Sequence, residues 1–181
     1  MRRILVTGST GAGKTTLAQA VAGRLGVPFH EMDALALTGP GWAENPRLIE
    51  EVATISAGPG WVFDSLGYPQ VRDLLWGQAD GIVWLDYPRR VVMARVLRRS
   101  AARTLRRRRV FGGNVESVGL WLTRDHPAWW AWSQYDARRA EIAERIERFR
   151  PPEVVRLGNP RAAREWLAGL EREPVGEEAQ D

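Results

Sequence analysis

Short apolar runs alternate along the chain with stretches of helical periodicity. The runs predict β-strands at 3–7, 27–30, 61–64, 81–86 and 154–157. Neighbouring runs are far enough apart for the long crossover connections that join parallel strands. The pattern therefore predicts an α/β fold in three layers, with a five-stranded parallel sheet and helices on both of its faces.

Periodicity locates the helices between these runs. In Lys14–Leu25, apolar residues recur at every fourth position, and Gly26 follows as a helix stop. The pair Asn45-Pro46 predicts the start of a second helix. The apolar face of that helix consists of Leu48, Ile49, Val52 and Ile55. Further helices are predicted at about 88–100, 127–150 and 160–170.

Two segments lack such a period. Residues 101–119 are rich in arginine and glycine, which predicts a mobile loop that serves as a small lid. Residues 171–181 are acidic and are expected to form a disordered tail. We therefore expect one domain over residues 1–170.

Composition narrows the class of protein. The chain has 181 residues, of which 44% are hydrophobic, and this suits one globular domain with a real core. It has no cysteine, so neither a disulfide framework nor a Cys-based metal site is expected. The apolar run near the start is too short for a signal peptide, and no apolar stretch is long enough to span a bilayer. We expect a cytoplasmic protein without a membrane partner.

The first strand and first helix enclose a phosphate-binding motif. Residues 8–15 read GSTGAGKT and match G-x-x-x-x-G-K-[ST] at every fixed position. Glycines let the backbone N–H groups surround an anion, and the start of the helix adds its dipole. Lys14 is expected to reach the β- and γ-phosphates of ATP, and the Thr15 hydroxyl to bind Mg²⁺. The predicted nucleotide-binding set here is Gly8, Ser9, Thr10, Gly11, Ala12, Gly13, Lys14, Thr15 and Thr16.

Lys14 is the only lysine of the chain, and every other basic side chain except the two histidines is arginine. Arginine is a poor substitute where a compact charge must fit among phosphates. A lysine kept at this one position therefore supports the phosphate-binding interpretation.

Three aspartates lie at or just beyond strand ends, where the ligand crevice of an open α/β sheet forms. Asp64 is predicted to hold the metal together with Thr15. Asp86 also suits that role, but Tyr87-Pro88 follows it, so it could instead cap the next helix. Asp33 is predicted to face the acceptor or to act as the base, with an ordinary loop acid as the alternative.

Arginines are concentrated between Arg95 and Arg109. They could form a phosphate clamp, a strip that binds nucleic acid, or a solvated basic face. Arg95 and Arg99 are four residues apart and share a helix face, which can look into the nucleotide site. The spacing favours a clamp that stabilises charge on the transferred group.

Taken in order, these motifs resemble the adenylate kinase-like group of P-loop kinases, and most of all the bacterial topology-modulation proteins, also labelled adenylate kinase-like ATPases. The resemblance covers residues 2–170. It is carried by 8–15, 32–35 leading to 40–42, 61–64, 83–88 and 94–99. It implies the P-loop NTPase fold, a lid and a second pocket for the phosphoryl acceptor.

The resemblance also implies residue roles. Arg95 would pack on adenine, Arg99 would meet the phosphates, and either Arg138 or Arg139 would add a cation after the lid. The adenine would also be touched by Gly158, Asn159 and Pro160. Adenylate kinases carry an arginine after the third strand that binds the phosphate of AMP, but here 64–70 read DSLGYPQ. AMP is therefore disfavoured as the acceptor.

These features predict an ATP- and Mg²⁺-dependent phosphotransferase that transfers the γ-phosphoryl group to a small hydroxyl- or phosphate-bearing acceptor, a small molecule or a nucleotide. The predicted catalytic residues are Lys14, Asp33, Asp64, Arg95 and Arg99. The alternative is a regulatory ATPase or a nucleic acid-associated NTPase. The sequence leaves the acceptor and the oligomeric state open.

Overall fold

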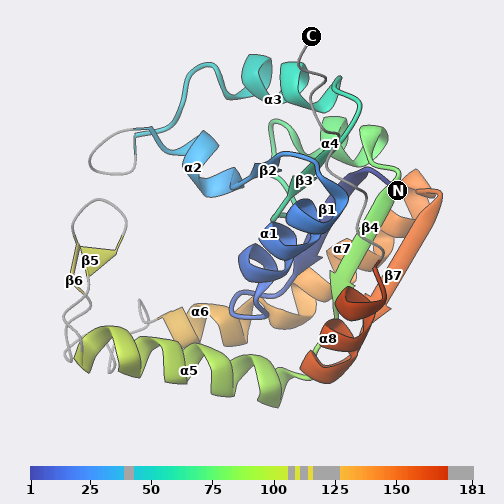
Figure 1. Ribbon diagram of the computed structural model, residues 1–181. Helices are drawn as coiled ribbons and strands as arrows, with labels where there is room; N and C mark the ends of the chain where they lie inside the picture. Colours follow the sequence, from blue (N-terminus) through green and yellow to red (C-terminus); the bar gives the residue numbers. More distant parts are fainter. Residues whose placement is uncertain (39–42, 106–108, 111–113, 116–126, 171–181) are drawn as a thin grey trace, which may run out of the picture.

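A computed structural model describes residues 1–38, 43–105, 109–110, 114–115 and 127–170 (Figure 1). Strands and helices alternate along most of this part of the chain. No helix within it is long and apolar enough to cross a membrane.

The strands form one five-stranded sheet with the order β2-β3-β1-β4-β7. Its strands are β1 (Arg3–Gly8), β2 (Phe29–His30), β3 (Trp61–Phe63), β4 (Gly81–Leu85) and β7 (Glu153–Leu157). All neighbouring strands pair in parallel. The predicted sheet is confirmed, with β2 shorter than expected.

Helices cover both faces of the sheet. Alternate residues of the central strands point to opposite sides and are apolar on both, so each face needs a cover of helices. Ile4 and Val6 of β1 belong to one core, whereas Leu5 between them belongs to the other. The first core includes residues of α1 (Lys14–Leu25), α5 (Arg89–Leu105) and α8 (Pro160–Gly169). The second includes residues of α2 (Met32–Ala36), α3 (Leu48–Ser56), α4 (Arg72–Gln78) and α7 (Tyr135–Phe149).

The structure corrects several helix boundaries. The helices α2 and α4 were not predicted, because each is too short to show a clear period. The helix α5 continues to Leu105, so the first part of the predicted loop 101–119 is helical. That loop also contains β5 (Arg109–Val110) and β6 (Asn114–Val115), which pair antiparallel. Its other residues, and the predicted tail 171–181, lie outside the described part of the chain.

The prediction of one helix over 127–150 is wrong. The segment forms α6 (Pro127–Ser133) and α7, with Gln134 between them. Tyr135 at the start of α7 is buried, and its hydroxyl donates a hydrogen bond to the carbonyl oxygen of Tyr87 at 2.8 Å. This contact holds the start of α7 beside the segment that follows β4. The periodicity of the sequence cannot reveal such a long-range contact.

Candidate active site

The loop between β1 and α1 has a backbone that requires glycine. Gly11 and Gly13 have φ angles of 84° and 97°, which side chains with a Cβ rarely adopt. A Cβ at Gly11 would lie 2.4 Å from a methyl carbon of Val96, and one at Gly13 would lie 2.9 Å from the Arg95 guanidinium. Gly13 also starts α1 without a side-chain cap. The first N–H groups of α1 therefore receive no capping bond from this residue and suit an anion.

This loop borders a polar cavity of about 330 Å³. Eight predicted site residues line the cavity, namely Gly8, Thr10, Gly11, Lys14, Thr15, Asp33, Asp64 and Arg99. Three further residues line it, namely Ser65, Leu66 and Arg138. Ser65 and Leu66 follow Asp64 at the end of β3, so their position after a strand end is a clue that the sequence offers. The family resemblance implied that either Arg138 or Arg139 would supply a cation here, and Arg138 is the one that lines the cavity.

Asp64 and Thr15 meet at the floor of this cavity. The Thr15 hydroxyl donates a hydrogen bond to Asp64 Oδ2 at 2.5 Å, and the N–H of Met32 donates to Asp64 Oδ1 at 3.1 Å. Asp64 is buried, so these bonds fix its carboxylate. A hydroxyl and a carboxylate side by side are hard oxygen donors, which suit Mg²⁺ held by one or two protein groups and by phosphates.

Lys14 points its ammonium group back over the loop, where Nζ donates to the carbonyl oxygen of Ser9 at 3.3 Å. Removal from water lowers its pKa from 10.5 to about 8, although the charge of Asp64 opposes this change. Arg138 and Arg99 lower the pKa further. A triphosphate among these three cations would relieve their mutual repulsion, so the cavity is electrostatically suited to an anion.

Asp33 lies on α2, across the cavity from the phosphate-binding loop. Its Oδ1 accepts a hydrogen bond from the Tyr68 hydroxyl at 3.2 Å. Burial raises the pKa of Tyr68 to about 12, and the carboxylates of Asp33 and Glu44 contribute. Tyr68 therefore stays protonated at physiological pH and keeps Asp33 oriented. Tyr68 could not be identified from sequence, because nothing in its local pattern shows which side chain it contacts.

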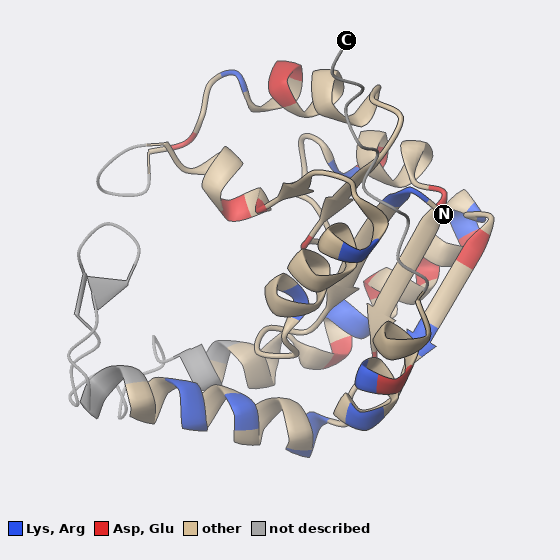
Figure 2. Ribbon diagram, in the orientation of Figure 1, with Lys and Arg blue, Asp and Glu red and all other residues tan. Residues whose placement is uncertain are grey.

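Basic side chains reach the loop from α5 and α7. Arg99 lines the cavity from α5, which carries several basic residues along its length (Figure 2). Arg95, one turn earlier, lies against Gly13, and its guanidinium carbon is 5.8 Å from the centre of the Tyr87 ring. Arg138 lines the cavity from α7. Three arginines from two helices thus lie around the loop.

Asp86 lies outside the cavity lining and has other partners. Its carboxylate accepts hydrogen bonds from Arg139 at 2.7 Å and from Arg156 at 2.8 Å. Burial raises the pKa of Asp86, but these two guanidinium groups outweigh it and hold the pKa below its ordinary value. Through these two arginines the carboxylate links the end of β4 to α7 and β7, so its role is structural. Of the adjacent arginines on α7, Arg138 lines the polar cavity and Arg139 binds Asp86.

The three residues predicted to touch adenine follow β7. Asn159 caps α8, because its side-chain oxygen accepts hydrogen bonds from the N–H groups of Arg161 and Ala162. Pro160 is the first residue of α8, and a Cβ on Gly158 would meet no atom within 4 Å. None of the three lines the described phosphate cavity. Their contact with adenine stays a prediction.

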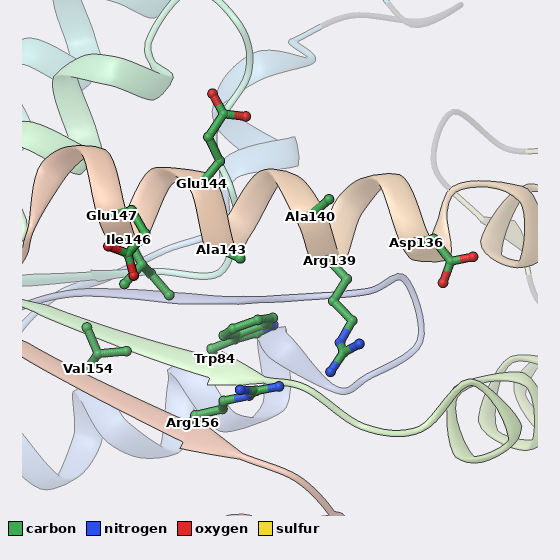
Figure 3. Close-up of a pocket in the computed structure, with 10 residues that line it drawn as sticks. All are labelled: Trp84, Asp136, Arg139, Ala140, Ala143, Glu144, Ile146, Glu147, Val154 and Arg156. Atoms are coloured by element: carbon green, nitrogen blue, oxygen red, sulfur yellow. The ribbon is translucent and has the colours of Figure 1, made fainter.

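A larger cavity of about 670 Å³ lies between α7 and the strands β4 and β7 (Figure 3). Trp84 and Val154 line it from the strands, and Arg139 extends from α7 toward Arg156. The guanidinium carbon of Arg156 is 4.7 Å from the centre of the Trp84 ring. The lining residues do not include the phosphate-binding loop, so the smaller polar cavity is the candidate active site.

Comparisons with known proteins agree with this fold. Residues 4–60 match the model of the ATPase family associated with various cellular activities (AAA). A gluconokinase from Sinorhizobium meliloti 1021 is 20% identical with a TM-score of 0.51, and the match covers 93% of this chain and 91% of that one. A shikimate kinase from Bacteroides thetaiotaomicron is 19% identical with a TM-score of 0.54, over 92% and 94% of the two chains. A sugar kinase from Janibacter sp. HTCC2649 is 20% identical with a TM-score of 0.50, over 96% of each chain.

These matches show the class of fold. The chain has the P-loop NTPase fold, in the arrangement shared with small P-loop kinases. The fold prediction is confirmed. At this level of identity the matches show the fold alone, and the function must be argued from the site of this chain.

Proposed function

We propose that this chain is an ATP- and Mg²⁺-dependent phosphotransferase of the adenylate kinase-like type, similar to the bacterial topology-modulation proteins. The observation that carries the proposal is the polar cavity. It brings a phosphate-binding loop, a hydroxyl–carboxylate pair and a second carboxylate, Asp33, within one space of about 330 Å³. In a kinase, a carboxylate in the position of Asp33 can orient the acceptor hydroxyl and accept its proton.

Each residue of the cavity has a task in this proposal. The loop N–H groups and Lys14 hold the β- and γ-phosphates, while Arg99 and Arg138 stabilise negative charge on the transferred group. Thr15 and Asp64 would hold Mg²⁺, which neutralises charge on the β- and γ-phosphates. Arg95, which lies against Gly13, would pack on the adenine, with Gly158, Asn159 and Pro160 as the proposed second wall.

The reaction joins the acceptor oxygen to the γ-phosphorus. The bond from this phosphorus to the β–γ bridging oxygen breaks, and its electron pair leaves with ADP. The proton of the acceptor hydroxyl passes to the Asp33 carboxylate, which the Tyr68 hydroxyl holds in place at 3.2 Å. Arg99 and Arg138 stay in place throughout, so they favour the transition state without rearrangement.

The test uses Lys14→Ala in an assay of ADP formation with a pool of metabolites. In the unaltered protein, one or a few compounds should raise ADP formation sharply above the rate with ATP alone. Lys14→Ala should lose this turnover by on the order of a hundredfold or more and should keep its fold, as judged by circular dichroism. Arg148→Ala removes a cation from the far end of α7 and is the control.

Two results would contradict the proposal. Unchanged ATP affinity and turnover in Lys14→Ala would remove the phosphate-binding role of the loop. Stimulation of ADP formation by DNA or RNA, with no response to any metabolite, would instead favour a nucleic acid-associated NTPase.

A further inference from the structure

The acceptor must approach the γ-phosphate from the side of Asp33, opposite the phosphate-binding loop. Three described stretches form that side, residues 31–38, 43–46 and 61–71, which include α2 and the turn after β3. Besides the proposed Mg²⁺ ligand Asp64 they contain Glu31, Asp33 and Glu44, but no lysine, arginine or histidine. This is unusual in a chain with 26 lysines and arginines among 181 residues. The acceptor side is therefore negatively charged, whereas α5 beyond it is basic (Figure 2).

A second cavity of about 180 Å³ is lined by Tyr68. The Tyr68 hydroxyl donates a hydrogen bond to Asp33, which lines the phosphate cavity, so this pair links a wall of one cavity to a wall of the other. The other lining residues are Ala36, Glu44, Asn45, Pro46, Leu48, Ile49 and Gln70. None of these residues is basic.

Two arginines directly follow these segments, and each has its own partners. Arg72 donates a hydrogen bond to the carbonyl oxygen of Gly67 at 2.8 Å and pairs with Glu141. Arg47 is 72% exposed and pairs with Glu51 at 3.3 Å. His30, which precedes the acidic segment, stacks on Phe63, and burial lowers its pKa, so it adds no positive charge at neutral pH. Lys14, Arg99 and Arg138 lie at the phosphate-binding loop, where the phosphates of ATP would neutralise them.

Other groups respond to the negative potential of this side. Burial raises the pKa of Glu31, and the neighbouring carboxylates of Asp64 and Asp33 raise it further. The pKa of Tyr68 is raised to about 12 by burial and by Asp33 and Glu44. A carboxylate or phosphate on the acceptor would meet the carboxylates of Asp33 and Glu44, while the cations that line the phosphate cavity would be engaged by the phosphates of ATP.

We propose that the acceptor is a hydroxyl compound without a carboxylate or phosphate group, that is, a neutral alcohol or one that bears an amine. This inference rests on the proposed phosphotransferase function and specifies its substrate class. The transferred group joins the hydroxyl oxygen of that compound, ADP leaves with the electron pair of the broken bond, and Asp33 receives the hydroxyl proton.

Matched compounds that differ in charge test the inference. Glucosamine, glucose and gluconate form one series, and uridine with uridine monophosphate forms another. The screen also includes polyols, amino alcohols and hydroxy acids. ADP formation is measured with MgATP at neutral pH. We expect the active compounds to be neutral or amine-bearing. Their anionic counterparts should have a kcat/KM lower by about tenfold or more. An anionic compound that is preferred over its neutral and amine-bearing counterparts would overturn the inference and leave the phosphotransferase proposal standing.

A charge placed in the second cavity gives an independent test. Gln70 lines this cavity. The variant Gln70→Arg should therefore lower the ratio of kcat/KM for a neutral compound to kcat/KM for its anionic counterpart by on the order of tenfold. Gln19→Arg makes the same substitution on the exposed side of α1 and is the matched control. Equal preferences in the two variants would show that the acceptor does not occupy this cavity, which contradicts the inference. If no compound of any charge raises ADP formation while Lys14-dependent ATP hydrolysis persists, the phosphotransferase proposal fails, and the inference fails with it.

Discussion

The lowered pKa of Lys14 makes ATP binding depend on pH in a specific direction. In the free protein this pKa is about 8, because the ammonium is removed from water beside Arg138 and Arg99. Bound phosphates favour the charged form, so the pKa rises when ATP binds. Between the two pKa values the complex holds more protons than the free protein. Affinity for ATP must therefore fall as the pH rises above about 8.

The size of the effect follows from the fraction of Lys14 that is protonated. With a pKa of about 8, most of the free protein carries the charged amine at pH 7 and only about a tenth carries it at pH 9. The Kd for MgATP should therefore rise about tenfold between these two pH values and about thirtyfold by pH 9.5. Tyr68, with a pKa of about 12, does not titrate in this range.

Isothermal titration calorimetry measures both the affinity and the protons taken up. Titrations in two buffers of different ionisation enthalpy should show uptake of about half a proton per ATP near pH 8. Lys14→Met has no amine to titrate, so its weaker binding should vary little over the same range. A Kd of the unaltered protein that stays constant from pH 7 to 9.5 would refute the assigned position of Lys14 among the phosphates.

Three further predictions concern single residues and one segment. Asp64→Asn should lower metal-dependent turnover by on the order of a hundredfold, whereas Asp86→Asn should keep most turnover and lose about 1 kcal/mol of unfolding free energy in a urea titration. The reverse ranking of turnover would assign the metal to Asp86. Arg99→Ala should reduce kcat far more than ATP affinity in steady-state kinetics, because charge on the transferred group builds up in the transition state. Equal losses would mean that Arg99 only helps to hold the nucleotide. If residues 101–119 form the lid that the sequence predicts, their hydrogen exchange should slow when ATP and acceptor are both bound, and equal exchange with and without them would contradict that prediction.

The phosphate-binding loop and the parallel sheet could be predicted from sequence because their rules are local. The glycines of 8–15 and the apolar strands each encode one conformation without reference to distant residues. The position of Asp64 and Asp33 after strands also placed both near the crevice, and the cavity contains both.

Contacts between distant residues could not be predicted in the same way. Arg138 and Arg139 are adjacent and chemically identical, and only the packing of α7 directs the first to the cavity and the second to Asp86. Tyr68 contacts Asp33 across 35 residues of sequence. Next to the break at Gln134, Tyr135 likewise makes a buried contact with the distant residue Tyr87. Tertiary packing sets such positions, and the periodicity of a sequence carries no information about contacts between distant residues.

The unusual basicity of Lys14 has a consequence for chemical labelling. Near pH 8 about half of its side chains carry an uncharged amine, which is the nucleophilic form. Because the sequence contains no other lysine, an acylating or aldehyde reagent would meet one amine side chain, and that amine lies at the phosphate-binding loop. The candidate active site thus contains its own attachment point for a reporter group, and bound nucleotide would protect it from modification.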